Sequence, residues 1–258
     1  MILAMDVGNT NIEIGILNET PNDYTIIDSI RYFTRVNITS DEFGMFLLNW
    51  FSNIGLDRKE IHSLVYSSVV PPMNGIVKRM YKKYFCGDVL VVDESINAGI
   101  VNSYRNPKEV GSDRIVNATA VHALYAKNAI VVDMGTATTI DVVTAGGNYL
   151  GGVIFPGINT ASQALRDKAS RLPAISIHHC TRILAEDTAS AIESGVYFSN
   201  YYALDGLIRG LAGEMGWTDY VKVGTGGVTN IFKETKLFDA IDDELALKGM
   251  KVIYDINR

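Results

Sequence analysis

The sequence predicts an α/β fold composed of two similar halves, and two observations carry this prediction. First, residues 3–17 and 131–143 both read as an apolar strand, a tight turn and a second strand. In each hairpin an aspartate, Asp6 or Asp133, ends the first strand and a glycine follows two positions later; the aspartates lie 133 − 6 = 127 positions apart. Second, β-branched runs alternate with helical patterns along the rest of the chain, as they do in α/β proteins.

After the first hairpin, the first half alternates strands with helices. Residues 24–35 read as a strand. Residues 40–54 predict a helix, because a serine can cap its start and large apolar side chains recur on one face. The run HSLVYSSVV at 62–70 reads as a buried strand that two prolines stop, followed by a helix at 73–84 and a strand at 89–92.

The second half continues the same alternation. Its expected elements are a helix over 114–125, a strand over 149–155, a helix from 157 to about 169, a long glycine-interrupted helix over 187–215, a strand over 221–225, a helix after 229 and a strand near 252–254. The economical arrangement is two α/β domains, residues 1–113 and 114–258, that face a central cleft.

The two turns have the composition of phosphate-binding loops. A glycine lets a ligand approach the backbone, and successive N–H groups at such a turn form a concave anion site. The aspartates would repel a polyphosphate unless a cation lies between them, so Asp6 and Asp133 predict bound cations, most simply Mg²⁺. Asp, Asn, Gly and Thr also occur in ordinary turns, but two matching copies favour the phosphate interpretation.

Composition narrows the class of protein. The chain has 258 residues, 47% hydrophobic and 20% charged, which is typical of an ordinary globular protein. The net charge of −6 argues mildly against nucleic acid as the main partner. We expect no membrane association and a cytoplasmic location, because no long apolar run or signal sequence is visible and only Cys86 and Cys180 are present.

Five motifs in order give the chain a specific resemblance. They are DVGNT at 6–10, YRNPKEVGSDRIVNA at 104–118, DMGTAT at 133–138, GGVIFPG at 151–157 and TGG at 225–227. Each is weak alone, but together they span nearly the full length, and the chain resembles the type III pantothenate kinases. The duplicated Asp-x-Gly hairpins also resemble those of the actin, Hsp70 and sugar-kinase superfamily.

This resemblance implies a fold, an activity and partners. The fold would be two ribonuclease-H-like halves, as in actin-like ATPases, with a central nucleotide cleft. The activity would be transfer of the γ-phosphate of ATP to the 4′-hydroxyl of pantothenate, the first step of coenzyme A biosynthesis. The implied cofactors are ATP, Mg²⁺ and a monovalent cation, K⁺ or NH₄⁺, and the implied assembly is a homodimer.

By resemblance, Asp113 is the catalytic base that accepts the proton of the attacking hydroxyl. From its position alone, Asp113 could simply be an acidic residue in the first turn of a helix, where the helix dipole favours it. The substrate-binding residues that the resemblance implies are Tyr104, Gly111, Ser112, Asp113, Arg114 and Thr188. The alternatives are half-buried packing for Tyr104, a salt bridge for Arg114 and a helix-capping role that Thr188 shares with Asp187.

The nucleotide site is also implied by resemblance. The ATP-binding residues are Asp6, Val7, Gly8, Asn9, Thr10, Asn11, Ile12, Glu13, Thr136 and Gly226. Asp133 matches a position that binds the monovalent cation, which leaves Mg²⁺ with the ATP phosphates near Asp6.

The chain departs from the family pattern at a few positions. Ser112 stands where the family usually has alanine, Asp187 stands where it often has asparagine, and residues 177–182 are unlike the expected pattern. An aspartate at 187 could repel the pantothenate carboxylate. Residues 178–180, His-His-Cys, are adjacent and would point to opposite faces of a strand, so we do not interpret them as a metal site.

Residues 189–215 are apolar on more than one helical face, which fits either a central core helix or a helix packed against a second chain. Two other functions compete with the pantothenate kinase: a kinase of another small hydroxy acid, and a non-catalytic regulatory or binding homologue. The intact Asp6, Asp113 and Asp133 weigh against lost catalysis, because a binding module needs no catalytic base.

Overall fold

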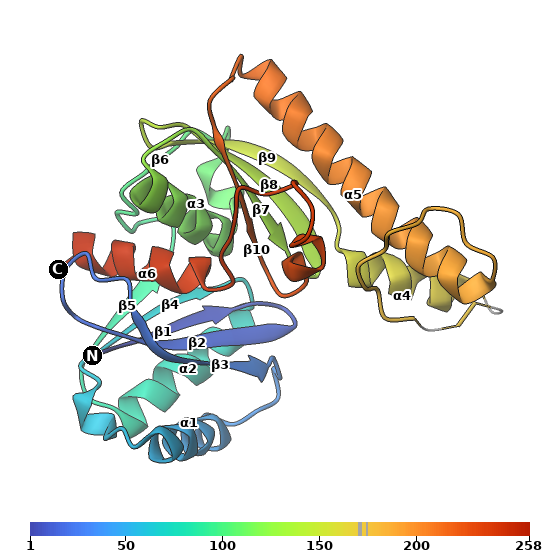
Figure 1. The fold of residues 1–258 in the computed structure, drawn as a ribbon. Coiled ribbons are helices and arrows are strands. Elements are labelled where there is room, and N and C mark those ends of the chain that lie inside the picture. Colours follow the sequence, from blue (N-terminus) through green and yellow to red (C-terminus); the bar gives the residue numbers. More distant parts are fainter. Residues whose placement is uncertain (170–171, 174) are drawn as a thin grey trace. The chain divides into compact units, whose positions relative to one another are not determined.

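The structure is a computed structural model that describes residues 1–169, 172–173 and 175–258 (Figure 1). The chain forms two compact units, one of residues 1–123 with 244–258 and one of residues 124–243. The compact units therefore differ from the expected halves 1–113 and 114–258, because the C-terminal segment joins the first unit. In the described part of the chain, no helix has both the length and the apolar character needed to cross a membrane.

The first unit is built around one mixed sheet. Its elements are β1 (Ile2–Val7), β2 (Asn11–Leu17), β3 (Ile26–Phe33), α1 (Ser40–Ile54), η1 (Arg58–Glu60), β4 (Ser63–Ser68), α2 (Pro71–Tyr84), β5 (Asp88–Val92), β6 (Val101–Asn102), η2 (Pro107–Glu109), α3 (Ser112–Tyr125, whose end enters the second unit) and α6 (Leu245–Ile256). The strand order is β3-β2-β1-β4-β5; β1, β4 and β5 are parallel, and β2 is antiparallel to both of its neighbours.

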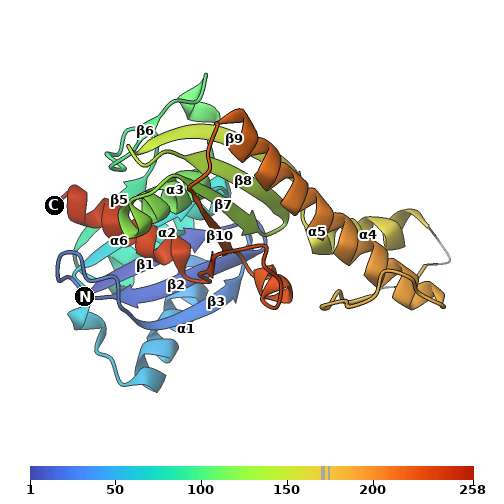
Figure 2. The same cartoon turned by 45° about the horizontal axis from the view of Figure 1, so that its top comes forward.

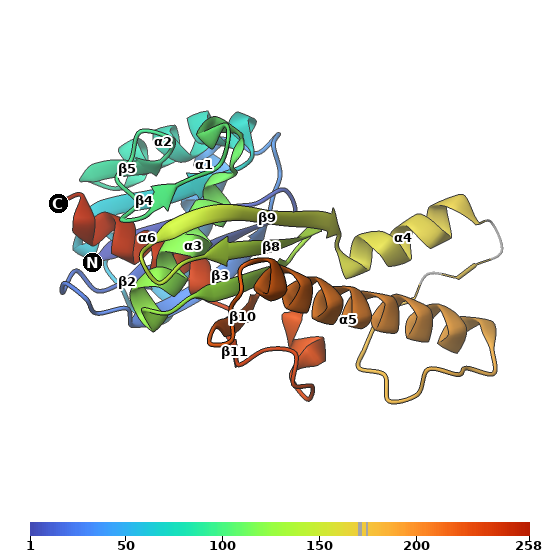
Figure 3. The same ribbon diagram turned by 90° about the horizontal axis from the view of Figure 1, so that it is seen from above.

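Both faces of this sheet are buried, as the period-2 geometry of β1 shows. Leu3, Met5 and Val7 belong to a core cluster with α1 and α2, whereas Ile2 and Ala4 belong to a cluster with α6. Figure 3 shows α1 and α2 on one side of the sheet and α6 on the other. Burial on two faces explains why β1 is a nearly continuous apolar run and why the buried serines of β4 are small.

The second unit repeats the strand order of the first. Its elements are β7 (Ala129–Met134), β8 (Ala137–Val143), β9 (Asn148–Pro156), α4 (Ile158–Lys168), α5 (Thr188–Glu214), β10 (Val221–Thr225), η3 (Thr229–Phe232) and β11 (Ala240–Ile241). Within this unit the order is β9-β8-β7-β10-β11, with β7, β10 and β11 parallel and β8 antiparallel to its neighbours. Helices α4 and α5 lie side by side (Figure 2).

If residues 6–11 are aligned with 133–138 without a gap, Asn11 matches Thr138, but the register of the two hairpins differs from this alignment. Asp6 pairs with Glu13, seven positions on, whereas Asp133 pairs with Thr139, six positions on. The first turn is therefore one residue longer. The two motifs match from the aspartate to the glycine, but beyond the turn Asn11 corresponds to Ala137 and not to Thr138.

Four local expectations were wrong. Helix α1 is capped by Thr39, whose hydroxyl accepts from the N–H of Glu42, and not by Ser40. The prolines at 71 and 72 begin α2 instead of separating it from the preceding strand, since a proline lacks only an N–H that the first turn leaves unbonded anyway. The segment near 252–254 is helical: Leu247, Met250 and Ile253 recur at a helical spacing and pack on the first sheet, and this outweighs the strand preference of β-branched residues. The expected helix after 229 is only a short 3₁₀ turn.

Candidate functional site

The turn between β1 and β2 is exposed and anchored by hydrogen bonds. The N–H of Gly8 donates to the carbonyl of Asn11 over 3.0 Å. Thr34, which follows β3, donates its hydroxyl to the carbonyl of Gly8 over 2.7 Å and its N–H to that of Thr10 over 2.9 Å. Asn9, Thr10 and Asn11 are exposed, so a ligand can reach their donor groups.

The other predicted ATP-binding residues of this hairpin differ in access. Val7 and Ile12 are fully buried in the core, so only their backbone could contact a nucleotide. Asp6 and Glu13 are half-buried and face each other in the register of β1 and β2. A carboxylate oxygen of Glu13 lies 3.6 Å from a guanidinium nitrogen of Arg31, and the two side chains form an ion pair between neighbouring strands.

The start of α3 lies against the end of β4, next to the end of β1. Asp6 pairs with Ser67 in the register of β1 and β4. The hydroxyls of Ser67 and Ser112 are 2.9 Å apart, and the N–H of Ser68 donates to the Ser112 hydroxyl over 3.2 Å. The structure thus brings Asp6 and the segment that carries Asp113 to one edge of the first sheet, where parallel strands end and α/β proteins commonly bind ligands.

Asp113 occupies the first turn of α3 and is half-buried. Its Oδ1 accepts a hydrogen bond from the N–H of Arg114 over 2.8 Å. The N-terminal end of a helix favours an acidic side chain, so the position of Asp113 suits a carboxylate. Arg114 itself is only 6% exposed, and Tyr104 is half-buried.

A cavity of about 380 Å³ lies beside this segment, within the first unit. The residues that line it include Gly111, Ser112, Ser68 and Asn74. Glu94 and Lys108 also line the cavity, and they form an ion pair at 3.6 Å. Among the described residues, the buried side-chain oxygen of Asn74 has no hydrogen-bond partner. The cavity therefore places polar groups next to the predicted substrate-binding residues.

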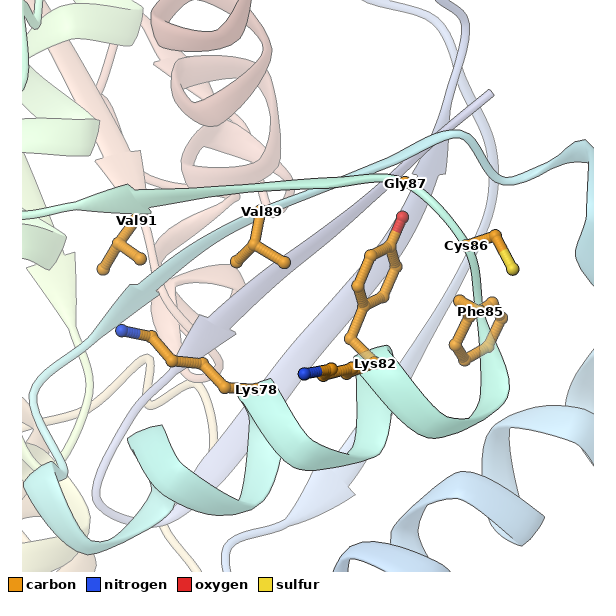
Figure 4. Close-up of a pocket in the computed structure, with 8 residues that line it drawn as sticks. Lys78, Lys82, Phe85, Cys86, Gly87, Val89 and Val91 are labelled. Carbon is orange, nitrogen blue, oxygen red and sulfur yellow. The ribbon is translucent and has the colours of Figure 1, made fainter.

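A groove of about 620 Å³ between α2 and β5 is larger, but its lining contains none of the predicted site residues (Figure 4). Lys78 and Lys82 project from α2, and Val89 and Val91 project from β5. The cavity beside Ser112 is therefore the better candidate for a substrate pocket.

In the second unit, Asp133, Thr136 and Gly226 lie around one turn. Thr225 pairs with Asp133 in the register of β10 and β7, so Gly226 follows directly beside the aspartate. The carbonyl of Thr136 accepts hydrogen bonds from the Gly157 N–H over 3.1 Å and from the Thr160 hydroxyl over 2.6 Å. Thr136 is exposed and Asp133 half-buried, so both can face a ligand.

Thr188 is the first residue of α5 and lies in the second unit, whereas the segment 111–114 lies in the first. The helix cap is Asp187: its Oδ1 accepts from the N–H of Ser190 over 2.9 Å, and the Ser190 hydroxyl also donates to it. These hydrogen bonds lower the pKa of Asp187, with the Ser190 hydroxyl as the largest cause. Thr188 is exposed and lines a groove of about 570 Å³ beside α4 and α5.

The segment before α5 is attached to it through two histidines. Nδ1 of His178 lies 2.9 Å from a carboxylate oxygen of Glu193, and Nδ1 of His179 lies 2.9 Å from the hydroxyl of Tyr197. The two rings thus contact different residues one helical turn apart on α5.

The sequence reasoning missed several residues that shape these turns, namely Thr34, Ser67, Ser68, Asn74 and Thr160. Ser67 and Ser68 had a usable signal: they are polar residues that end an apolar strand, and strand ends are where α/β proteins place their sites. Thr34 and Thr160 act through hydrogen bonds that only the folded chain reveals.

Comparison with known proteins agrees with the motifs. The family model of the type III pantothenate kinases matches residues 2–210. A type III pantothenate kinase from Syntrophus aciditrophicus (strain SB) is 40% identical over 258 residues, which covers 100% of both chains. A second, from Koribacter versatilis (strain Ellin345), is 38% identical over 265 residues and is covered over 96% of its length, with 100% of this chain matched.

Solved structures support the fold. A Campylobacter jejuni protein named as a Baf family transcriptional activator superposes with a TM-score of 0.62 at 20% identity, covering 99% of this chain and 98% of that one. The activator of 2-hydroxyisocaproyl-CoA dehydratase from Clostridium difficile gives 0.51 at 12% identity, covering 99% and 94%. These likenesses concern the fold alone, and they confirm the predicted duplicated α/β fold of the actin-like ATPases and sugar kinases. The match of the family model over residues 2–210 and the 40% identity over the full length show that the chain belongs to the type III pantothenate kinase family.

Proposed function

We propose that this protein is an ATP-dependent pantothenate kinase, which transfers the γ-phosphate of ATP to the 4′-hydroxyl of pantothenate in the first step of coenzyme A biosynthesis. Family membership over the full length supports this reaction. The structural observation that supports it best is the position of Asp113, at the start of α3 and joined through Ser112 to the end of β4, beside a cavity of about 380 Å³.

In this proposal Asp113 orients the attacking hydroxyl of pantothenate and accepts its proton late in the transfer. Gly111 and Ser112 contribute backbone contacts to the acceptor substrate, and Tyr104, Arg114 and Thr188 complete its site. Arg114 would hold the pantothenate carboxylate through two parallel hydrogen bonds. Asp187 caps α5, so its carboxylate already has hydrogen-bond partners of its own.

In this proposal the turn of the first hairpin binds ATP phosphates. Residues 9–11 are exposed and offer hydroxyl and amide donors, while Gly8, Val7 and Ile12 would contribute backbone groups only. Thr136 and Gly226 would contact the nucleotide from the second unit. The close approach of Gly226 to the neighbouring backbone shows a turn without room for a side chain.

The two aspartates suit different cations. The half-buried carboxylate of Asp6 offers the hard oxygen ligands that Mg²⁺ prefers, shared with phosphate and water. Mg²⁺ bound with ATP would neutralise charge on the transferred phosphoryl group. Asp133, beside the Gly226 turn, would hold the monovalent cation, K⁺ or NH₄⁺, through its carboxylate.

We propose that the active form is a homodimer that packs through α5. Six of its exposed residues recur at intervals of three or four positions and so fall on one stripe of the helix. They are Gly195, Ser199, Tyr202, Gly206, Gly210 and Gly213. A Cβ added at any of these four glycines would meet no atom within 4 Å, so the stripe is open within one chain. We also propose a cytoplasmic location, which suits the two free thiols, Cys86 and Cys180.

The experiment that tests the function is ADP release from the purified full-length protein with ATP and Mg²⁺, with and without pantothenate, in K⁺ and then in Na⁺ buffer. Turnover that requires pantothenate and K⁺ supports the reaction and the second cation together. Turnover only with another small hydroxy acid would replace the substrate. ATP binding without turnover on any acceptor would support a regulatory homologue instead.

A further inference from the structure

The contact between Ser67 and Ser112 leaves one hydrogen atom to be assigned. Ser67 ends β4 and is fully buried, with an exposed fraction of 0%. Its Oγ lies 2.9 Å from the Oγ of Ser112, and the N–H of Ser68 donates to the same Ser112 oxygen over 3.2 Å. Each serine hydroxyl carries one hydrogen to donate and two lone pairs that accept. Only one of the two hydroxyl hydrogens can lie between the two oxygens.

Burial decides which serine donates. Among the described residues, Ser112 is the sole hydrogen-bond partner of the Ser67 hydroxyl. If Ser112 donated, the hydrogen of Ser67 would be buried without an acceptor, a loss of about 1–3 kcal/mol. Ser67 is therefore the donor. The Ser112 oxygen then accepts from both Ser67 and Ser68, which occupies its two lone pairs and leaves its own hydrogen uncommitted.

The cavity beside Ser112 is open to this hydrogen. Ser112 is half-buried, and it lines the cavity of about 380 Å³ next to Gly111. We infer that the side-chain hydroxyl of Ser112 is a hydrogen-bond donor to an oxygen atom of the acceptor substrate in this cavity. This inference deepens the proposed function and rests on it for the identity of the substrate.

The chemistry fits the substrate class. Ser112 presents a donor, and the adjacent Asp113 presents a carboxylate that accepts. The pair would select a molecule with a reactive hydroxyl close to a second oxygen that can accept a hydrogen bond. Pantothenate has a second hydroxyl and an amide carbonyl near its 4′-hydroxyl. A simple alcohol lacks this second oxygen and would lose the contact.

The first test measures substrate binding. For Ser112→Ala, we expect the dissociation constant of pantothenate, measured by calorimetry with a non-hydrolysable ATP analogue, to rise about 3- to 10-fold, the effect of one neutral hydrogen bond. The affinity for the ATP analogue should not change. Ser67→Ala is the matched control: it removes the buried partner but leaves the Ser112 donor, so it should lower the melting temperature and leave pantothenate affinity within 2-fold. Equal losses of affinity in the two variants would mean that the pair only supports the fold, and would overturn the inference.

The second test does not depend on the substrate. Neutron diffraction from deuterium-exchanged crystals locates hydroxyl deuterium atoms directly. We expect the deuterium of Ser67 to point at the Ser112 oxygen, and that of Ser112 to point into the cavity toward a water molecule. A Ser112 deuterium that points at Ser67 would contradict the inference. If the wild-type protein binds no pantothenate, the proposed function fails, and the deuterium positions still decide which hydroxyl faces the cavity.

Discussion

Gly226 and Asp133 lie so close that no other residue type fits at position 226 without movement. A Cβ built on Gly226 would lie 2.6 Å from Oδ1 of Asp133 and 2.6 Å from the backbone nitrogen of Met134. The φ angle of Gly226 is +94°, a conformation that favours glycine. The turn after β10 is therefore shaped around the carboxylate that we assign to the monovalent cation.

Gly226→Ala should disturb this carboxylate and the turn together. We expect a loss of stability on the order of 1–3 kcal/mol, the usual magnitude for an unfavourable backbone conformation. We also expect weaker activation by K⁺, because the added methyl group displaces Asp133. Thermal unfolding and a K⁺ titration of turnover measure the two effects. The control is Gly146→Ala, whose Cβ would be 3.6 Å from the side chain of Asn148, an ordinary contact distance, and which should change neither quantity. A Gly226→Ala protein with wild-type stability would refute the steric argument.

Asp133→Ala should abolish the dependence on monovalent cation, because it removes the charged ligand. The measurement is ADP release over a range of K⁺ concentrations with the ionic strength held constant by Na⁺. Asp219→Ala, which removes an exposed carboxylate of the same unit, should keep the wild-type K⁺ response. If K⁺ still stimulates the Asp133 variant, the cation binds elsewhere.

Asp113→Asn tests the catalytic base. The amide keeps the size of the side chain and an oxygen that can accept from the Arg114 N–H, but it cannot take a proton. We expect turnover to fall by on the order of 10² or more, with unchanged ATP affinity. Asp88→Asn, at an exposed position of the same unit, should retain full activity. Normal turnover in Asp113→Asn would remove Asp113 from the base role and leave it as a first-turn residue of α3.

The sequence was sufficient for features that depend on local patterns. The two Asp-x-Gly hairpins, the bounds of α1 and the long α5 follow from alternation, helical periodicity and turn residues, and the structure confirms them. The sequence was insufficient where packing between segments far apart in the chain decides the local structure. The helix at 245–256 forms because its apolar face covers a sheet made by residues far away in the chain. The difference of one residue between the hairpin turns is visible only in the strand register.

The residues of the candidate site also form two groups, those that the sequence predicts and those that only the structure shows. Asp6, Asp113 and Asp133 could be chosen from motifs, because each belongs to one of the short strings that carry the family resemblance. The partners that hold those strings, such as Ser67 against Ser112, are separated from them by tens of positions. No sequence pattern predicts that β4 ends beside the start of α3. The two hydrogen bonds that the Ser112 hydroxyl accepts, from Ser67 and Ser68, are therefore visible only in the structure.

Tyr197 should make the second unit sensitive to high pH. Its burial raises its pKa to about 12 from an ordinary value of 10.0. The folded-state pKa is above the unfolded-state value, so this stabilisation is complete below pH 10 and is lost as the pH rises towards 12. Tyr197→Phe cannot ionise, and its stability should fall less between these two pH values. At neutral pH the variant should lose about 1 kcal/mol, because the hydrogen bond to His179 is gone.

The measurement for Tyr197 is urea unfolding at several pH values from 7 to 12, together with tyrosinate absorbance of the folded protein. Tyr81 is also buried, and burial raises its pKa as well, so it provides an internal reference that remains in the variant. If wild type and Tyr197→Phe lose stability in parallel above pH 10, Tyr197 does not carry the alkaline sensitivity.

A large side chain on the α5 stripe should be tolerated by a single chain but should disrupt the proposed dimer. A substitution at Gly206 can therefore distinguish the two states. A Cβ there would meet no atom within 4 Å apart from the backbone of its own helix, and position 206 is exposed, so in a monomer Gly206→Leu should leave the fold intact or stabilise the helix by about 0.5–1 kcal/mol. In the proposed dimer the same side chain would separate two closely packed helices. We therefore expect Gly206→Leu to shift the mass measured by light scattering from dimer to monomer while helix content is retained. Glu214→Leu, at the exposed end of α5, should remain dimeric. A wild-type protein that is monomeric at all concentrations, or a Gly206→Leu protein that stays dimeric, would show that the stripe is not the interface.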